Sequence, residues 1–406
     1  MSLFALQMMN YVLPLFTFPY LTRVLGPERF GLLAFAGAFG QYFVTVVDYG
    51  FNLSATKKVS VNRHDPSRIA VITSSVLTIK TALAVLCLMT LSAIVSFVPK
   101  FRDEQLLYYV CYIPVVGNLL FPVWFYQGME KIKFMSMLNV ASKIISTVCV
   151  FIFIRHRSDY LLAALIPALG VVLPGLVGMI LLFSHEKVTA RFARWHEVKE
   201  CLSDGWPIFV SLMSTSVLGN TGIFLLGLFT SNTVVGYFSI AQKVLWACIN
   251  LISPIANSIY PRVSMLFHDS FDKGLAFIRK TLRYGCAVFG AMSLALFLFA
   301  GVIVHLAMGQ YDPNVIMLIR IMSPLPCLIF IDNMYGMQLM LNIGLERSFM
   351  RVYLISVVFL VAASCLLIPW MQAVGSAIAQ VAVELLTMSL MYFIVRARGI
   401  SLLHSR

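Results

Sequence analysis

Apolar residues fill this chain in long runs that are separated only by short polar interruptions. A run of about 20 residues forms an α-helix long enough to cross the ~30 Å hydrocarbon core of a bilayer. Runs of this kind occupy nearly the whole chain. They lie near residues 3–22, 32–54, 69–95, 106–126, 134–154, 160–183, 206–229, 235–257, 284–308, 314–340, 352–368 and 375–395. The pattern predicts an all-α membrane protein of about twelve transmembrane helices.

Positive charge gathers in every second loop. Loops after even-numbered spans, together with the C-terminal tail, hold twenty Lys and Arg, whereas loops after odd-numbered spans hold six. Because loops rich in Lys and Arg stay in the cytoplasm, we expect both termini to be cytoplasmic. The first run has no basic leader or cleavage site, so we expect it to remain as the first helix.

Composition supports a membrane location and limits the chemistry. Of the 406 residues, 60% are hydrophobic and only 12% are charged, whereas soluble domains carry about 25% charged residues. The net charge of +13 follows the topology pattern, so we expect no nucleic-acid partner. The chain has no phosphate-binding loop, H-E-x-x-H, G-x-S-x-G or C-x-x-C motif. We therefore expect no catalytic residues, no metal, no cofactor and no disulfides among its eight cysteines.

Three short segments of the first half recur in the same order in the second half. Phe30-Gly31-Leu32 corresponds to Val235-Gly236-Tyr237, Lys58-Val59-Ser60 to Arg262-Val263-Ser264, and Gly128-Met129-Glu130 to Gly344-Leu345-Glu346. The repeat spans six helices, an even number, so both copies have the same orientation in the membrane. We expect two parallel-repeat six-helix bundles, at residues 1–200 and 201–406, on either side of a central cleft.

Several ionisable side chains fall inside the predicted spans. They are Asp48, Lys80, Lys143, Lys243, Arg320, Asp332 and Glu384, with Arg23 near the exported end of the first span. Such groups are expensive at membrane depth and usually mark a functional site. On one interpretation, the cations Arg23, Lys80, Lys143, Lys243 and Arg320 line a cleft that binds an anionic head group.

A structural interpretation stays open for the same residues. The cations inside the spans could be neutralised by Asp48, Asp332 and Glu384 so that the helices can pack, and Arg23 and Arg320 could extend their charges to the interface. The three acids could also serve in ion coupling. Glu384, near the midplane, is a candidate proton carrier on this view, with a structural ion pair as the alternative.

Three sequence segments resemble those of a known protein family. Asn10-Tyr11, followed by the segment Phe18-Pro19-Tyr20-Leu21-Thr22-Arg23-Val24-Leu25-Gly26-Pro27-Glu28-Arg29-Phe30-Gly31, resembles the opening of bacterial O-antigen flippases. Trp124-Phe125-Tyr126-Gln127-Gly128 and Tyr260-Pro261-Arg262-Val263-Ser264 resemble the same family at corresponding places. The resemblance covers nearly the full length and is most specific in the first sixty residues.

The resemblance implies a function. Members of this family belong to the polysaccharide transporters, within the exporter superfamily that also contains multidrug extruders and the lipid II flippase. They move an undecaprenyl-diphosphate-linked oligosaccharide, the O-antigen repeat unit, from the cytoplasmic to the periplasmic leaflet during lipopolysaccharide biosynthesis. The implied partners are this lipid, the surrounding membrane lipid, an O-antigen polymerase and a chain-length regulator. Arg23 is the best-placed candidate contact by resemblance.

Two competing functions fit parts of the same pattern. An ion-coupled multidrug-type exporter would share the architecture but would favour carboxylates in its cavity. An integral-membrane O-antigen polymerase or glycosyltransferase would act on the same lipid. Such enzymes usually need a substantial hydrophilic loop, and here no exported loop exceeds about seven residues. We therefore favour a flippase that works by alternating access and needs no covalent chemistry.

Overall fold

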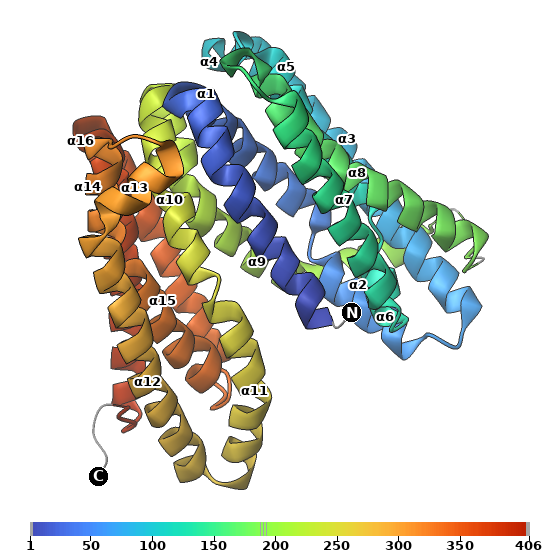
Figure 1. The fold of residues 1–406 in the computed structure, drawn as a ribbon. Coiled ribbons are helices and arrows are strands. Elements are labelled where there is room, and N and C mark those ends of the chain that lie inside the picture. The colour runs from blue at the N-terminus through green and yellow to red at the C-terminus, as the bar shows by residue number, and fades with distance from the viewer. Residues whose placement is uncertain (1–2, 187, 190, 192, 403–406) are drawn as a thin grey trace. The chain divides into compact units, whose positions relative to one another are not determined.

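The chain is helical throughout the part that the structure describes. The computed structural model describes residues 3–402 apart from 187, 190 and 192, with side chains from residue 13 onward. The exact start of the chain and the side chain of Asn10 lie outside the described residues. The chain divides into two compact units, Met1–Asn220 and Thr221–Arg406 (Figure 1).

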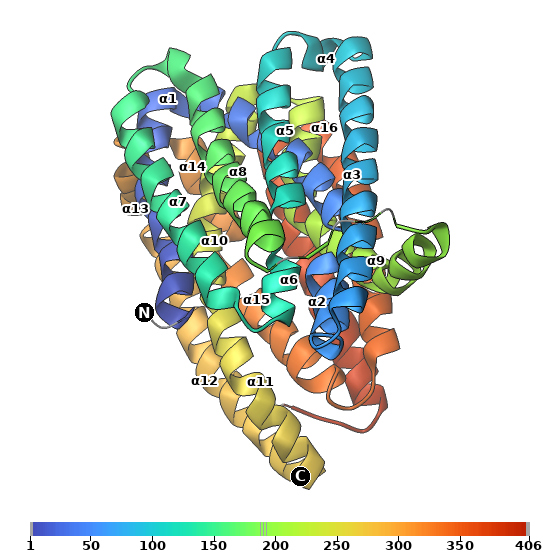
Figure 2. The ribbon, with the colours of Figure 1, turned by 90° about the vertical axis from the view of Figure 1, so that its right-hand side faces the viewer.

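The first unit contains nine helical elements and the first part of a tenth. They are α1 (Leu3–Asp48), α2 (Phe51–Val61), α3 (Pro66–Phe97), α4 (Pro99–Arg102), α5 (Gln105–Leu120), α6 (Val123–Gly128), α7 (Ile132–Phe153), the short 3₁₀ helix η1 (Arg157–Asp159), α8 (Tyr160–Ser184) and the beginning of α9 (Trp195–Phe229). Helices α5, α7 and α8 run side by side, as Figures 1 and 2 both show.

Helix α1 is two helices joined at a sharp break. Gly26 has φ 71° and ψ 171°, a conformation that glycine adopts without steric cost, and Pro27 follows it. The rings of Phe18 and Phe30, one from each side of the break, lie 5.9 Å apart between centroids. The two arms therefore pack against each other as a helical hairpin.

Aromatic residues of α6 form part of the core of the first unit. Trp124, Phe125 and Tyr126 are all at least 97% buried. The Thr56 hydroxyl of α2 donates to the Trp124 carbonyl at 3.1 Å. A Cβ atom on Gly128 would lie 2.6 Å from the Val59 side chain, so only glycine lets α6 approach α2 this closely. This family motif has a packing role.

The first part of α9 belongs to the first unit because it packs on the turn between α1 and α2. The rings of Tyr49 and Phe209 stack at 4.8 Å, and Lys58 forms salt bridges with Glu200 at 3.0 Å and Asp204 at 2.7 Å.

The second unit contains the rest of α9 and eight further elements. They are α10 (Asn232–Ile249), α11 (Ile252–Asp269), α12 (Phe271–Leu298), α13 (Ala300–Met308), α14 (Pro313–Met322), α15 (Leu325–Asn333), the π-helix η2 (Met334–Met340) and α16 (Glu346–Ala397). Figures 1 and 2 show α11 and α12 as neighbours that join at one end of this unit.

Helix α16 also contains a break. Gln372 has φ 49° and ψ −126°, which is unusual for a residue with a Cβ atom. The hydroxyls of Ser356 and Thr387, one from each side of the break, lie 2.7 Å apart and share a hydrogen bond. The two arms of α16 therefore also form a hairpin.

Ten helical stretches of the described chain are long and apolar enough to cross a membrane. Two of them, Leu13–Val61 with 49 residues and Glu346–Ala397 with 52, are about twice the length that one crossing needs. These two stretches contain the breaks at Gly26 and Gln372. The prediction of an all-helical membrane protein is confirmed, whereas the prediction of twelve crossings depends on how the broken helices are counted.

Ion pairs of the first unit show which of its loops lie together. At one end, Arg63 pairs with Glu130 at 2.7 Å, and Lys131 pairs with Glu186 at 2.6 Å, so three predicted cytoplasmic loops meet there. At the other end, Arg29 joins predicted exported segments. The basic loops therefore gather at the same end of this unit.

Candidate functional site

The most deeply buried charge in the first unit is Lys80, on α3, whose side chain is 1% exposed. Its ammonium group donates a 2.9 Å hydrogen bond to the Asn118 backbone carbonyl on α5. The Asp48 carboxylate lies 4.0 Å away. Asp48, Lys80 and Asn118 lie on three different helices, so α1, α3 and α5 must pack together to form this ionic cluster.

The Asp48 carboxylate is held by several donors. Asp48 is the last residue of α1, and Tyr49 and Gly50 follow it with left-handed φ values of 47° and 77°. The side chain of Asn52 donates to the carboxylate at 2.7 Å, and Asn118 and the Gly50 backbone N–H also interact with it. A buried ion pair is tolerated only when its polar atoms have partners of this kind.

This geometry favours the structural interpretation for Lys80. In the described conformation the Lys80 side chain is almost fully buried, and its ammonium group contacts Asn118 and Asp48, which both belong to the first unit. The sequence predicted both charged residues but left their pairing open.

A second cluster lies in the second unit and consists of acids. Asp332, on α15, is 4% exposed and interacts with Glu384, on the second arm of α16. The hydroxyl of Tyr353 lies near both carboxyl groups. No hydroxyl, amide or cationic donor among the described residues hydrogen-bonds to either Asp332 oxygen.

Two facing carboxylates repel each other when both are charged, so a pair of this kind favours a shared proton or a bound cation. The π-helix η2 begins two residues after Asp332. Such π-turns interrupt regular hydrogen bonding and are frequent at functional sites. The second unit therefore contains a pair of interacting acids beside an irregular helical segment.

The other predicted cations are more accessible. Arg23 on α1, Lys243 on α10 and Arg320 on α14 are exposed, and Lys143 on α7 is half-buried. The Arg320 guanidinium lies 5.7 Å from the centroid of the Phe297 ring. These four residues are spread over both units, and the prediction that they line one site stays a prediction.

Sequence reasoning missed a polar cluster at the end of the first unit that is predicted to be exported. Arg29 pairs with Glu104 at 2.8 Å, and the Tyr160 hydroxyl donates to the same carboxylate at 2.6 Å. The Arg29 guanidinium also lies 4.5 Å from the centroid of the Tyr160 ring. Arg29 falls in the opening family motif, which was the available signal, and its contacts tie α1, α5 and α8 together.

A family model described as polysaccharide biosynthesis protein matches residues 1–267. Two curated relatives carry the name "Putative O-antigen transporter". The relative from Escherichia coli (strain K12) is 32% identical over 387 residues, which cover 95% of this chain and 93% of the relative. The relative from Shigella dysenteriae is 27% identical over 359 residues, which cover 88% of this chain and 89% of the relative.

Solved structures share the fold at low sequence identity. An inward-facing multidrug resistance MATE family transporter of the MOP superfamily matches with a TM-score of 0.76 and 15% identity, covering 96% of this chain and 94% of the other. The lipid II flippase MurJ, in an inward closed conformation, matches with a TM-score of 0.72 and 12% identity, covering 97% and 87%. The fold is therefore that of these transporters. With the family match over residues 1–267 and the 32% identical relative, the chain belongs to the polysaccharide biosynthesis protein family.

Proposed function

We propose that this protein is a flippase of the bacterial inner membrane that moves undecaprenyl-diphosphate-linked O-antigen repeat units from the cytoplasmic to the periplasmic leaflet. The observation that carries the proposal is the 32% identity, along 95% of the chain, to the Escherichia coli relative named "Putative O-antigen transporter". The shared fold with a lipid II flippase supports it. As a transporter, the protein needs no covalent chemistry.

We also propose the number of membrane crossings and the orientation of the chain in the membrane. Counting each arm of α1 and of α16 as one crossing adds two crossings to the ten long stretches. The chain then crosses the membrane twelve times, with both termini in the cytoplasm and the duplicated halves at residues 1–200 and 201–406. The gathering of basic loops at one end of the first unit supports this orientation.

Transport would proceed by alternating access between two bundles. The diphosphate and the sugars are polar and need cationic and hydrogen-bonding partners on their way through the membrane. Arg23, Lys243 and Arg320 are exposed and Lys143 is half-buried, so all four are more accessible to such a substrate than Lys80. Lys80 instead holds α1, α3 and α5 in place through Asp48 and Asn118. The acid pair Asp332–Glu384 would supply the ion-coupling step.

Leaflet assignment of the repeat unit tests the proposal. In a strain that lacks this gene, the lipid-linked sugars are probed in intact and in lysed spheroplasts. We expect complete repeat units to accumulate on the cytoplasmic leaflet, where the probe reaches them only after lysis. Single units that reach the periplasmic leaflet but stay unpolymerised would contradict a flippase and indicate a polymerase.

The multidrug-type exporter and the proposed partners need separate measurements. If the protein is an exporter of cationic drugs, deletion of its gene would change drug resistance and would leave the repeat unit in its normal leaflet.

Association with an O-antigen polymerase and a chain-length regulator would be measured by co-purification from membranes that contain all three proteins.

A further inference from the structure

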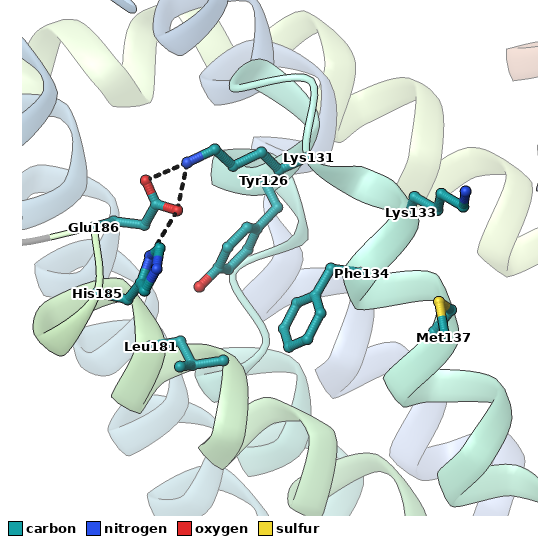
Figure 3. A pocket seen from close by; sticks show the side chains of 8 residues that line it. All are labelled: Tyr126, Lys131, Lys133, Phe134, Met137, Leu181, His185 and Glu186. Carbon is teal, nitrogen blue, oxygen red and sulfur yellow. Dashed lines mark hydrogen bonds and ion pairs between the residues drawn. The ribbon is translucent and has the colours of Figure 1, made fainter.

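An apolar groove lies at the basic end of the first unit, beside α6, α7 and α8. Its volume is about 540 Å³, within the range of small-molecule sites. Its floor consists of Tyr126, Phe134, Met137 and Leu181. The rings of Tyr126 and Phe134 lie 6.5 Å apart between centroids, and Figure 3 shows both rings turned into the groove. The floor offers aromatic and aliphatic surface for a hydrocarbon chain.

The rim of the groove carries one lysine in excess. Lys131 donates to both carboxylate oxygens of Glu186, at 2.6 and 2.7 Å, so that these two charges compensate each other. Lys133 also lines the groove, is exposed, and has no salt bridge with any described residue. In Figure 3 its side chain extends on the other side of Phe134 from the Lys131–Glu186 pair. The rim is therefore suited to an anion.

The helices that border the groove expose apolar residues along their length. On α7 the exposed residues recur every three or four positions from the groove onward, and α8 shows the same spacing. The α7 residues are Phe134, Met137, Ala141, Ile145, Val148 and Ile152, and the α8 residues are Leu169, Leu173, Leu176, Ile180 and Phe183. Exposed stripes of this composition on membrane helices face lipid chains. The groove thus continues an apolar, lipid-facing surface.

We propose that the groove binds an anionic glycerophospholipid, with one acyl chain over Phe134, Met137 and Leu181 and its phosphate at Lys133. Basic grooves between helices at the cytoplasmic side suit anionic lipid head groups. One uncompensated lysine matches a single phosphate, whereas a diphosphate with sugars would require further cations and hydrogen-bond donors. The binding is separate from the proposed transport, so either could fail without the other.

Lipid retention by the full-length protein tests the proposal. The protein is reconstituted in vesicles with equal amounts of phosphatidylglycerol, phosphatidylethanolamine and undecaprenyl phosphate, extracted, and analysed by native mass spectrometry. We expect the unmodified protein to retain phosphatidylglycerol preferentially. Lys133→Gln should lower that retention about fivefold, the effect of one basic residue on an anionic lipid. Lys133→Arg should keep most of it.

Two further variants separate a groove from general surface charge. Lys57→Gln removes an exposed lysine of the first unit that lies outside the groove, and it should leave retention unchanged. Met137→Trp fills the groove at a position that is 51% exposed, and it should reduce retention without unfolding the protein. Equal losses in Lys57→Gln and Lys133→Gln would overturn the proposal. Preferential retention of undecaprenyl phosphate through the same residues would also overturn it.

Discussion

The buried ammonium group of Lys80 has two partners in the first unit, the Asp48 carboxylate at 4.0 Å and the Asn118 backbone carbonyl at 2.9 Å. We predict that Lys80→Met destabilises the protein by about 3–5 kcal/mol, since it leaves the Asp48 carboxylate buried without its cation. Thermal unfolding of the purified protein in detergent measures the effect.

The double variant Asp48→Asn with Lys80→Met is the control for this prediction. It removes both charges together, so most of the lost stability should return. If Lys80→Met instead keeps full stability and abolishes transport, Lys80 contacts the substrate and the structural interpretation is wrong.

Hydropathy was sufficient to find the buried charges but not their partners. Asp48 and Lys80 lie on different helices, and the carbonyl of Asn118, which has no sequence signature, completes the cluster. Asp332 and Glu384 are both acids, so pairing by opposite charge could not have predicted their contact. The partners depend on how the helices pack, and a pattern along one chain does not contain that information.

At the scale of elements, a glycine lets α12 lie close to α15. A Cβ atom on Gly285 would overlap the ring of Phe330, which is 1% exposed and stacks on Phe289 at 4.8 Å. We predict that Gly285→Ala destabilises the protein by about 1–3 kcal/mol, the usual cost of an extra methyl group in a packed interior. Thermal unfolding in detergent again gives the measurement.

Gly290 on the same helix provides the matched control. Apart from its chain neighbours and the backbone of its own helix, no described atom lies within 4 Å of the position that its Cβ would take. Gly290→Ala should therefore leave stability unchanged or raise it by about 0.5–1 kcal/mol, because alanine favours the helix. Equal destabilisation by both substitutions would show that helix packing at Gly285 is not the cause.

The break in α16 makes a different prediction. Gln372 occupies a left-handed backbone conformation that costs a residue with a Cβ atom about 1–3 kcal/mol. Gln372→Gly should raise the unfolding temperature, whereas Gln372→Ala, which keeps the Cβ atom, should not. A lower unfolding temperature for the glycine variant would mean that the Gln372 side chain contributes more than its backbone strain costs.

Helix ends were harder to predict than helices. Gly26-Pro27 is a visible breaker, and the predicted spans 3–22 and 32–54 lie on either side of it. The segment between the spans 352–368 and 375–395 contains no comparable signal at Gln372 except Pro369. A non-glycine residue in a left-handed turn follows from the packing of the two arms, which propensity does not describe.

At the scale of the whole molecule, the fold class followed from hydropathy because a bilayer leaves a helical chain few alternatives. The family motifs then narrowed the function, and the comparisons agree with them. The structure shows that residues of these motifs have packing roles. Trp124 and Gly128 of α6 both pack against α2, and Arg29 joins three helices. The family motifs of this protein therefore include residues that stabilise the helix packing.

The acid pair of the second unit gives a prediction for transport itself. If Asp332 and Glu384 share a proton that is exchanged in each cycle, Glu384→Gln should remove the dependence of transport on a pH gradient. Asp332→Asn should have the same effect, and the double variant should add little, because both substitutions disable one unit. Flipping of the lipid-linked repeat unit in proteoliposomes, with and without an imposed gradient, is the measurement.

Glu346→Gln is the matched control for the acid pair, since Glu346 is an exposed carboxylate at the start of the same helix, α16. It should leave the gradient dependence intact. Unchanged gradient dependence in folded Glu384→Gln protein would exclude this pair from proton coupling. The carboxyl groups would then serve packing alone, and the energy for directional transport would have to come from another ion or from removal of the repeat unit by polymerisation.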